Sequence, residues 1–343
     1  MQEKKFEHIV PLRSIKQNTL LSVIVPVYNE ANGIFAFHER LEAALEQAPV
    51  ERKEIIYIND GSKDTSFDLL KTIADTDPNV QIIDFSRNFG KEAAMTAGIR
   101  QSRGDAVILI DADLQDPPEL IPKMVRQWQD GYDIVNMRRR SRAGETFLKK
   151  KTAQMFYTLM GLVGPVKMPE NVGDFRLLSR RAIEALKQMP ECNRFMKGMF
   201  AWIGFPVKEI LYRRDPRFAD KTNWNYWGLF NLAVEGITSY TIAPLRLSTY
   251  TGLFVAITSF CYGIYIVLNT LVYGDPVPGF PTLMVVILFL GGLQLVAIGI
   301  AGEYIGRIFL ETKSRPLYVV KDNYRRMSAS LSVPGKMPRK GVQ

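Results

Sequence analysis

The sequence predicts an α/β domain built on a mostly parallel sheet, followed by two helices long and apolar enough to cross a membrane. Over the first half of the 343 residues, short apolar runs alternate with segments of helical periodicity, and near the C-terminus two long stretches carry no charge. Strands that alternate with helices form βαβ units, in which the strands lie parallel. The two kinds of sequence therefore indicate two parts of different architecture.

The α/β part begins with regularly spaced elements. We expect strands at 21–27, 54–58, 80–85, 106–110 and 134–137, and helices at 34–46, 67–74 and 91–100. Ligands of parallel sheets bind beyond the carboxyl ends of the strands. Polar clusters stand at three of these ends, at 28–30, 59–61 and 111–113. The three clusters are therefore expected to meet at one site.

The two uncharged stretches, at 247–274 and 276–302, each exceed the roughly 20 residues that a helix needs to span a bilayer. The turn-rich segment between them lacks Lys and Arg, whereas six basic residues follow between 307 and 326. By the positive-inside rule both termini are expected in the cytosol. The first 20 residues are polar without an apolar core, so no signal peptide is expected.

These patterns divide the chain. The aromatic-rich segment 224–246 is interpreted as an amphipathic helix in the membrane interface, with packing against the α/β domain as the alternative. The expected divisions are a polar segment at 1–20, the α/β domain at 21–223, the interfacial segment at 224–246, transmembrane helices at 247–274 and 282–306, an extracytoplasmic loop at 275–281 and a basic cytosolic tail at 307–343.

The composition excludes several classes of function. Two cysteines provide neither a disulfide framework nor a Cys-based zinc site, and two histidines argue against His-centred catalysis. A net charge of +9 suits nucleic acid, an anionic membrane surface or phosphorylated ligands. Since no nucleic-acid-binding motif accompanies the basic stretches, nucleic acid is not expected as a partner.

The cluster after the fourth strand offers metal ligands. Asp111 and Asp113 are two residues apart, and the Gln115 amide follows at the same spacing. These are hard oxygen ligands of the kind that Mg²⁺ or Mn²⁺ prefers, and a diphosphate would complete the shell. A metal there would offset charge on a departing nucleoside diphosphate. An ordinary Asp-rich turn is the alternative.

Several segments together resemble glycosyltransferase family 2, which has a GT-A fold. The matching segments are 23–30, 58–64, 87–91, 111–118 and 302–308, and the resemblance extends over about 22–316. It is closest to the polyisoprenyl-phosphate branch, and there to the bactoprenol glucosyltransferases more than to dolichyl-phosphate mannose synthase. The resemblance, and not periodicity, supplies the expectation of sugar transfer.

The resemblance implies roles for individual residues. The nucleotide-sugar would be bound by Pro26, Tyr28, Asn29, Glu30, Asp60, Lys91, Asp111, Ala112 and Asp113. Asp111, Asp113 and Gln115 would hold the metal, and Asp113 and Asp174 would be catalytic. The alternatives are an ordinary turn at 60–62, a solvated Lys91 and a structural ion pair of Asp174.

The implied acceptor needs cations. A polyisoprenyl phosphate is largely ionised near neutral pH, since the second pKa of a phosphate monoester is about 6, so no strong general base is required. The candidate lipid-phosphate contacts are Arg138, Lys150, Lys151, Arg176, Arg213, Arg217 and Lys221. Charge runs are usually solvated, so two or three contacts are expected. Asp220 and Asn223 depart from the family pattern and leave the geometry of that loop open.

The expected reaction is inverting transfer of one sugar, glucose from UDP-glucose, to undecaprenyl phosphate. Alternative donors are GDP-mannose, UDP-GlcNAc and a UDP-amino-arabinose derivative. A processive polysaccharide synthase is disfavoured because its Q-x-x-R-W motif is absent from the sequence. A non-catalytic membrane scaffold that recruits a flippase is the alternative of another class. The resemblance also implies a homo-oligomer, a tetramer, in the bacterial inner membrane as a multi-pass protein.

Overall fold

The computed structural model describes residues 18–140, 172–191, 194–213, 243–273 and 279–325. The strands are β1 (Leu20–Val27), β2 (Arg52–Asn59), β3 (Val80–Phe85), β4 (Ala106–Leu109), β5 (Ile134–Arg139), β6 (Val172–Ser179), β7 (Val207–Tyr212) and β8 (Val320–Arg325). The helices are α1 (Ile34–Glu46), α2 (Ser66–Thr76), α3 (Lys91–Gln101), α4 (Ile121–Gln129), α6 (Arg180–Lys187), α7 (Met196–Trp202), α9 (Ala243–Tyr273) and α10 (Phe280–Thr312), with a 3-10 turn at Pro118–Leu120. The predicted strands and helices of the first half are confirmed.

The strands form one mixed sheet in the order β7-β5-β6-β4-β1-β2-β3-β8. Strands β4, β1, β2 and β3 lie parallel, so their carboxyl ends share one edge. Strand β6 is antiparallel to both β4 and β5, and β8 is antiparallel to β3. The predicted mostly parallel α/β fold is therefore confirmed.

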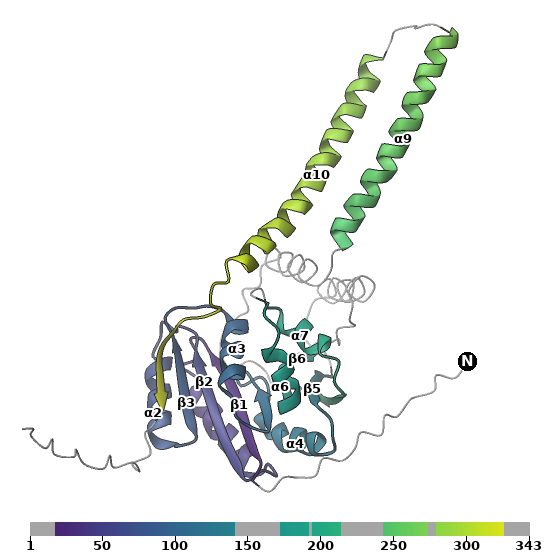
Figure 1. The fold of residues 1–343 in the computed structure, drawn as a ribbon. Helices are drawn as coiled ribbons and strands as arrows, with labels where there is room; N and C mark the ends of the chain where they lie inside the picture. The colour runs from purple at the N-terminus through teal and green to yellow at the C-terminus, as the bar shows by residue number, and fades with distance from the viewer. Residues whose placement is uncertain (1–17, 141–171, 192–193, 214–242, 274–278, 326–343) are drawn as a thin grey trace, which may run out of the picture.

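Helices cover both faces of the sheet (Figure 1). Alternate side chains of β1 point to opposite faces. Val23 and Val25 pack in the cluster that includes residues of α1, α2 and α4, whereas Ile24 packs with α3, α6 and α7. The sheet is thus the middle of three layers, and its strands are apolar on both faces because both are buried.

Helix α3 lies unusually close to the sheet. A Cβ atom on Gly98 would lie 2.3 Å from Cγ2 of Ile24 and 3.0 Å from Cδ1 of Ile58. A Cβ atom at this position would therefore force the Ile24 side chain or the helix to shift. The close packing fixes the helix whose first residue, Lys91, faces the candidate site.

We expect Gly98→Leu to lower the stability of the α/β domain by about 1 to 3 kcal/mol, the usual cost of overpacking a filled core. Unfolding of the detergent-solubilised chain, followed by tryptophan fluorescence, measures this. The control is Gln101→Leu at an exposed position of the same helix, which should stay within about 0.5 kcal/mol of wild type. Equal stability of the two variants would contradict the close approach.

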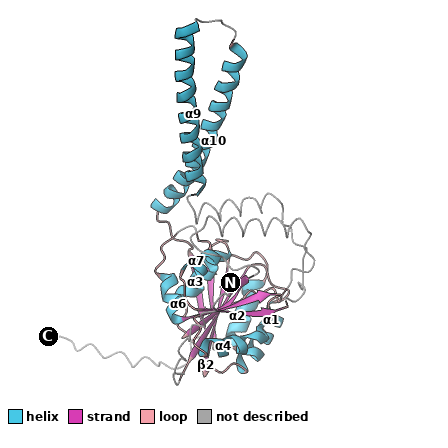
Figure 2. Ribbon diagram, turned by 90° about the vertical axis from the view of Figure 1, so that its right-hand side faces the viewer, coloured by secondary structure: helices cyan, strands magenta, loops and turns pink. Residues whose placement is uncertain are grey.

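Helices α9 and α10 form an apolar pair that extends away from the sheet (Figures 1 and 2). Their segments Pro244–Tyr265 and Phe289–Thr312 are long and apolar enough to span a membrane. Large apolar side chains are exposed along them, among them Phe254 and Phe260 at 71% each. Helix α9 begins before the expected position 247 and α10 continues past 306. Residues 274–278 and most of the interfacial segment lie outside the described residues.

Strand β8 was not expected from the sequence. Residues 320–325 fall in the predicted basic tail, but they extend the sheet along β3. Lys321 Nζ lies 3.1 Å from a carboxylate oxygen of Asp84, and the ring of Tyr318 stacks on Phe85 at 4.9 Å. The chain therefore returns from the apolar pair to the edge of the α/β domain.

Candidate functional site

The loops after β1 and β2 hold each other at the shared edge of the sheet. The Oδ1 atom of Asn29 accepts a hydrogen bond from the Lys63 amide at 2.8 Å, and the Asn29 amide donates to Ser62 Oγ at 3.0 Å. Asn29 has a φ of 55°, a left-handed conformation that asparagine tolerates. This turn leaves the Tyr28 ring 42% exposed at the rim, beside the half-buried Pro26. An exposed aromatic face is suited to stacking on a nucleobase.

Asp60 ties the second loop to the segment before α3. Its two carboxylate oxygens accept hydrogen bonds from the amides of Phe89, at 2.7 Å, and Gly90, at 2.9 Å. Burial raises the pKa of Asp60, although these two amides oppose the rise. Beside it, a Cβ on Gly61, whose φ is 63°, would lie 2.4 Å from the backbone of Arg87. Asp60 thus braces the site, and its predicted contact with the nucleotide-sugar stays a prediction.

Three predicted site residues meet in one ion-pair cluster. The ammonium group of Lys91, at the start of α3, donates to a carboxylate oxygen of Asp111 at 2.7 Å and to Asp174 Oδ2 at 2.5 Å. Asp111 follows β4 and Asp174 lies in β6, so residues far apart in sequence converge through the sheet. Lys91 is therefore ion-paired with both carboxylates, although 39% of its side chain stays exposed.

Ion pairing within this cluster shifts the pKa values of its buried groups. Burial would lower the pKa of Lys91, but the two carboxylates raise it above its ordinary value. Burial likewise opposes ionisation of Asp174, but Lys91 and then Lys197 hold the pKa of Asp174 below its ordinary value. The neighbouring Glu92 differs, because burial and Asp174 raise its pKa to about 7. The site therefore presents the Lys91 ammonium group beside an ionised Asp174, whereas burial raises the pKa of Asp111 against the opposing effect of Lys91.

The turn after β4 alternates between the core and the site. Ala112 and Leu114 are buried in the core, whereas Asp111, Asp113 and Gln115 are each partly exposed. Leu114 has a φ of 60°, and the Gln115 amide donates to Asp113 Oδ1 at 3.1 Å. The alternation leaves the three predicted metal ligands outside the core and partly accessible to solvent.

The sequence analysis did not predict which side chains support this turn. Asp116 is fully buried, and its Oδ1 accepts a hydrogen bond from the hydroxyl of Tyr212 in β7. Burial and Asp116 raise the pKa of Tyr212, so the phenol stays protonated, and Arg139 is hydrogen-bonded to the same hydroxyl. The only hint of this role in the sequence was that Asp116 belongs to the acidic turn.

The candidate lipid-phosphate contacts occupy different environments. Arg176 is 2% exposed, donates from Nη2 to the Gly173 carbonyl at 2.6 Å and lies 3.9 Å from the centre of the Phe200 ring. Burial lowers the pKa of Arg176 to about 10. Arg138 is paired with Glu209 at 3.0 Å, and Arg213 is exposed. Lys150, Lys151, Arg217 and Lys221 lie outside the described residues.

Arg176 therefore supports β6 beneath Asp174 and has almost no surface for a ligand in this conformation. Arg138 and Arg213 retain surface that a phosphate can reach. All these assignments stay predictions.

Comparison with known proteins gives a consistent picture. Residues 22–187 match the model "Glycosyl transferase family 2", and residues 243–308 match "GtrB C-terminal hairpin". The chain is 49% identical over 305 residues to the SfII prophage-derived bactoprenol glucosyl transferase of Shigella flexneri, covering 89% of this chain and 98% of the relative. It is 50% identical over 301 residues to the bactoprenol glucosyl transferase of Shigella phage SfX, covering 88% and 98%.

A third relative comes from a cyanobacterium. The chain is 48% identical over 302 residues to an uncharacterized glycosyltransferase of Synechocystis, covering 88% of this chain and 95% of the relative. The similarity thus includes both the α/β domain and the apolar pair in every one of these relatives, because each alignment spans nearly the whole of the relative.

Proposed function

The chain belongs to glycosyl transferase family 2, and from this premise we propose that it transfers glucose from UDP-glucose to a polyisoprenyl phosphate at the membrane. The observation that carries the proposal is the near-complete coverage of relatives named bactoprenol glucosyl transferases, at 49 to 50% identity. Helices α9 and α10 anchor the α/β domain to the membrane. The site therefore works where a lipid phosphate is available.

The reaction we propose is an inverting displacement. An oxygen of the lipid phosphate attacks the anomeric carbon of glucose from the side opposite the nucleotide, and the bond from that carbon to the UDP oxygen breaks. UDP leaves with the electron pair. The acceptor is already an oxyanion near neutral pH, since its second pKa is about 6. The chain therefore has to orient two anions and need not supply a strong base.

The donor would bind along the shared edge of β1, β2 and β4. Tyr28 offers an aromatic face for the base, and Asn29 and Asp60 hold the loops that carry it. Glu30 lies next to this face, and its amide donates to Ser66 Oγ at 2.9 Å. The diphosphate would reach the turn of Asp111 and Asp113. These proposed contacts would account for the polar residues at three separate strand ends.

The residues of the turn fit a divalent metal such as Mg²⁺ or Mn²⁺. Asp111, Asp113 and Gln115 offer hard oxygens from side chains that are each partly exposed. Asp174, which pairs with Lys91, has a buried Oδ1 atom that accepts no hydrogen bond from any described residue. This oxygen therefore remains able to interact with a positive charge. When bound, the metal supplies Lewis-acid stabilisation of the departing diphosphate.

Asp174 and Lys91 would position the reacting groups. Lys91 holds Asp111 and Asp174 together across the site. This arrangement sets the distance between the donor turn and β6, beside which the sugar would lie. The acceptor phosphate would then be held by cations near the membrane, with Arg138 and Arg213 as the described candidates. A bacterial inner-membrane location, cytosolic termini, a homo-oligomer and a flippase partner belong to the same proposal.

A donor panel tests the function. Full-length chain in lipid nanodiscs is given undecaprenyl phosphate with UDP-glucose, GDP-mannose, UDP-GlcNAc or a UDP-amino-arabinose donor, with Mg²⁺ or Mn²⁺ present or chelated. We expect labelled lipid with UDP-glucose, and its loss on chelation. Preference for another donor would replace the sugar assignment. Absence of transfer with every donor would favour the non-catalytic scaffold.

A further inference from the structure

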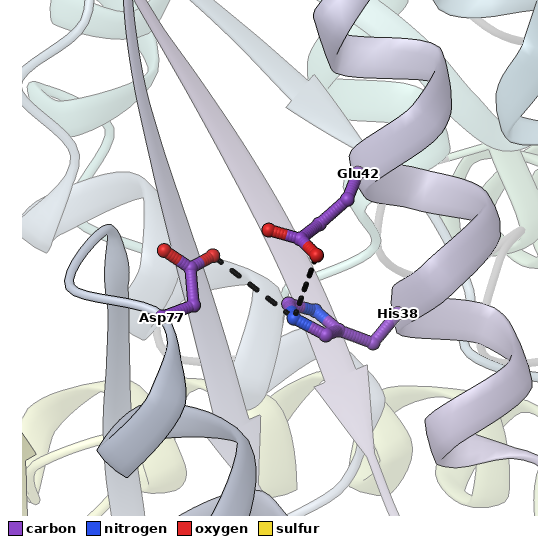
Figure 3. Close-up of side chains that lie close together, drawn as sticks. All are labelled: His38, Glu42 and Asp77. Atoms are coloured by element: carbon purple, nitrogen blue, oxygen red, sulfur yellow. Dashed lines mark ion pairs between the residues drawn. The ribbon is translucent and has the colours of Figure 1, made fainter.

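A second cluster of metal-ligating side chains lies apart from the donor site (Figure 3). His38 and Glu42 stand one turn apart on α1, and Asp77 follows the end of α2. The Nε2 atom of His38 lies 3.8 Å from Glu42 Oε2 and 4.0 Å from Asp77 Oδ2. One ligand atom from each of the three lies within 4.8 Å of the others. None of these residues belongs to the predicted donor or lipid site.

These contacts are too long to be hydrogen bonds, which join heavy atoms at about 2.7 to 3.2 Å. The side chain of Asp77 is only 7% exposed, yet its Oδ2 finds no hydrogen-bond donor in the part of the chain that the structure describes. Its other oxygen accepts from the amide and the side chain of Asn79. A buried oxygen without a donor is costly. It points at the imidazole and at the Glu42 carboxyl, whose pKa burial and then Asp77 raise, so a proton on Glu42 or a bound cation would satisfy it.

The histidine is oriented for metal binding. Its Nδ1 atom lies 3.0 Å from the hydroxyl of Tyr57, a fully buried residue of β2. If Nδ1 carries the proton and donates to that oxygen, the lone pair of Nε2 faces the two carboxylates. Such a hydrogen bond from the other ring nitrogen is the usual support of a metal-bound histidine. Burial lowers the pKa of His38, although Asp77 opposes this, and so favours the neutral ligand form.

We propose that His38, Glu42 and Asp77 form a second metal site, for a divalent transition-metal ion of the Zn²⁺ class. One imidazole nitrogen and two carboxylate oxygens suit Zn²⁺, with water in the fourth position. Ligand atoms about 2.0 to 2.2 Å from a tetrahedral ion are about 3.3 to 3.6 Å apart, so the two contacts of His38 Nε2, at 3.8 and 4.0 Å, need to shorten by roughly half an ångström. The Glu42 side chain is 40% exposed and opens a path to solvent.

The site would be structural and lies outside the proposed transfer reaction. It would clamp α1 to the end of α2 on the face of the sheet that these helices cover. Both helices follow loops of the donor edge, which carry Tyr28 and Asp60. An ion there would stabilise the fold of the α/β domain without contacting either substrate.

Zn²⁺ binding to the full-length chain in detergent tests the proposal. The background is Asp113→Asn, which removes a predicted ligand at the donor site, and purification uses a tag without histidine. We expect isothermal titration with ZnCl₂ to show one tight site and Zn²⁺ to raise the thermal midpoint. Adding His38→Gln should weaken binding at least tenfold and abolish the shift. The matched control is His8→Gln, the other histidine of the chain, which should bind as the background does.

A second variant guards against misfolding of the first. Glu42 is partly exposed, so Glu42→Gln is expected to fold and still to lose most of the Zn²⁺ affinity. Co²⁺ should give the visible absorption of a four-coordinate site in the background and lose it in both variants. Unchanged Zn²⁺ stoichiometry and affinity in His38→Gln and Glu42→Gln would overturn the proposal. Absence of tight Zn²⁺ binding to the background would do the same, and would favour a proton shared between the carboxylates.

Discussion

Asp113→Asn should reduce transfer by about 100- to 1,000-fold, the usual effect of removing one group that stabilises developing charge in a transition state. The substitution exchanges an anionic metal ligand for a neutral amide of the same size. Asp113 is partly exposed at the end of β4, so the fold should not depend on its charge. The initial rate of glucosyl transfer to undecaprenyl phosphate, measured in nanodiscs with saturating Mn²⁺, checks the prediction.

Two further measurements separate a lost metal from a lost fold. The thermal midpoint without metal should stay near that of wild type, and UDP should bind more weakly only when Mn²⁺ is present. The control is Asp68→Asn, at a side chain that is 78% exposed on α2, which should leave the rate unchanged. Wild-type turnover by well-folded Asp113→Asn would remove Asp113 from the metal site.

The strands and helices of the α/β core could be predicted because each is marked by a pattern in its own stretch of sequence. Strands β1 to β4 are apolar runs of strand length, and α1 to α3 show helical periodicity between them. The polar clusters at the strand ends follow from the parallel arrangement, since the carboxyl ends of such strands share an edge. The candidate site could therefore be located from the sequence, down to the turn at Asp111.

Other features of the structure depend on contacts between residues far apart in the sequence, which no local sequence pattern predicts. Strand β8, Val320–Arg325, is polar and almost wholly exposed, and it becomes a strand because β3 offers an unpaired edge. The hydrogen bond from Tyr212 to Asp116 joins residues 96 positions apart, and Lys91 lies 83 positions from Asp174. The carboxylate of Asp60 accepts hydrogen bonds from the amides of Phe89 and Gly90, which are 29 and 30 positions away. The sequence indicates which residue types gather, and the packing decides which of them pair.

Lys91→Met should lower turnover by about 100-fold or more, because it removes the ammonium group that bridges Asp111 and Asp174. The variant leaves two carboxylates near each other without the ammonium group between them, and like charges at short range repel. Asp174, which is largely buried, would move or take up a proton. Transfer rates with UDP-glucose varied at saturating lipid measure the loss. The control is Lys71→Met, at a lysine of α2 that pairs with the exposed Asp68.

A double-mutant cycle then shows how Lys91 acts. If it works by holding Asp174, Lys91→Met combined with Asp174→Asn should be little worse than the more damaging single variant, because residues in direct contact are not additive. If Lys91 instead binds the diphosphate independently, the two losses should multiply, and UDP affinity should fall in Lys91→Met but not in Asp174→Asn. The 2.5 Å contact between Lys91 and Asp174 favours the first result. Multiplicative losses would move Lys91 from a positioning role to a direct contact with the donor.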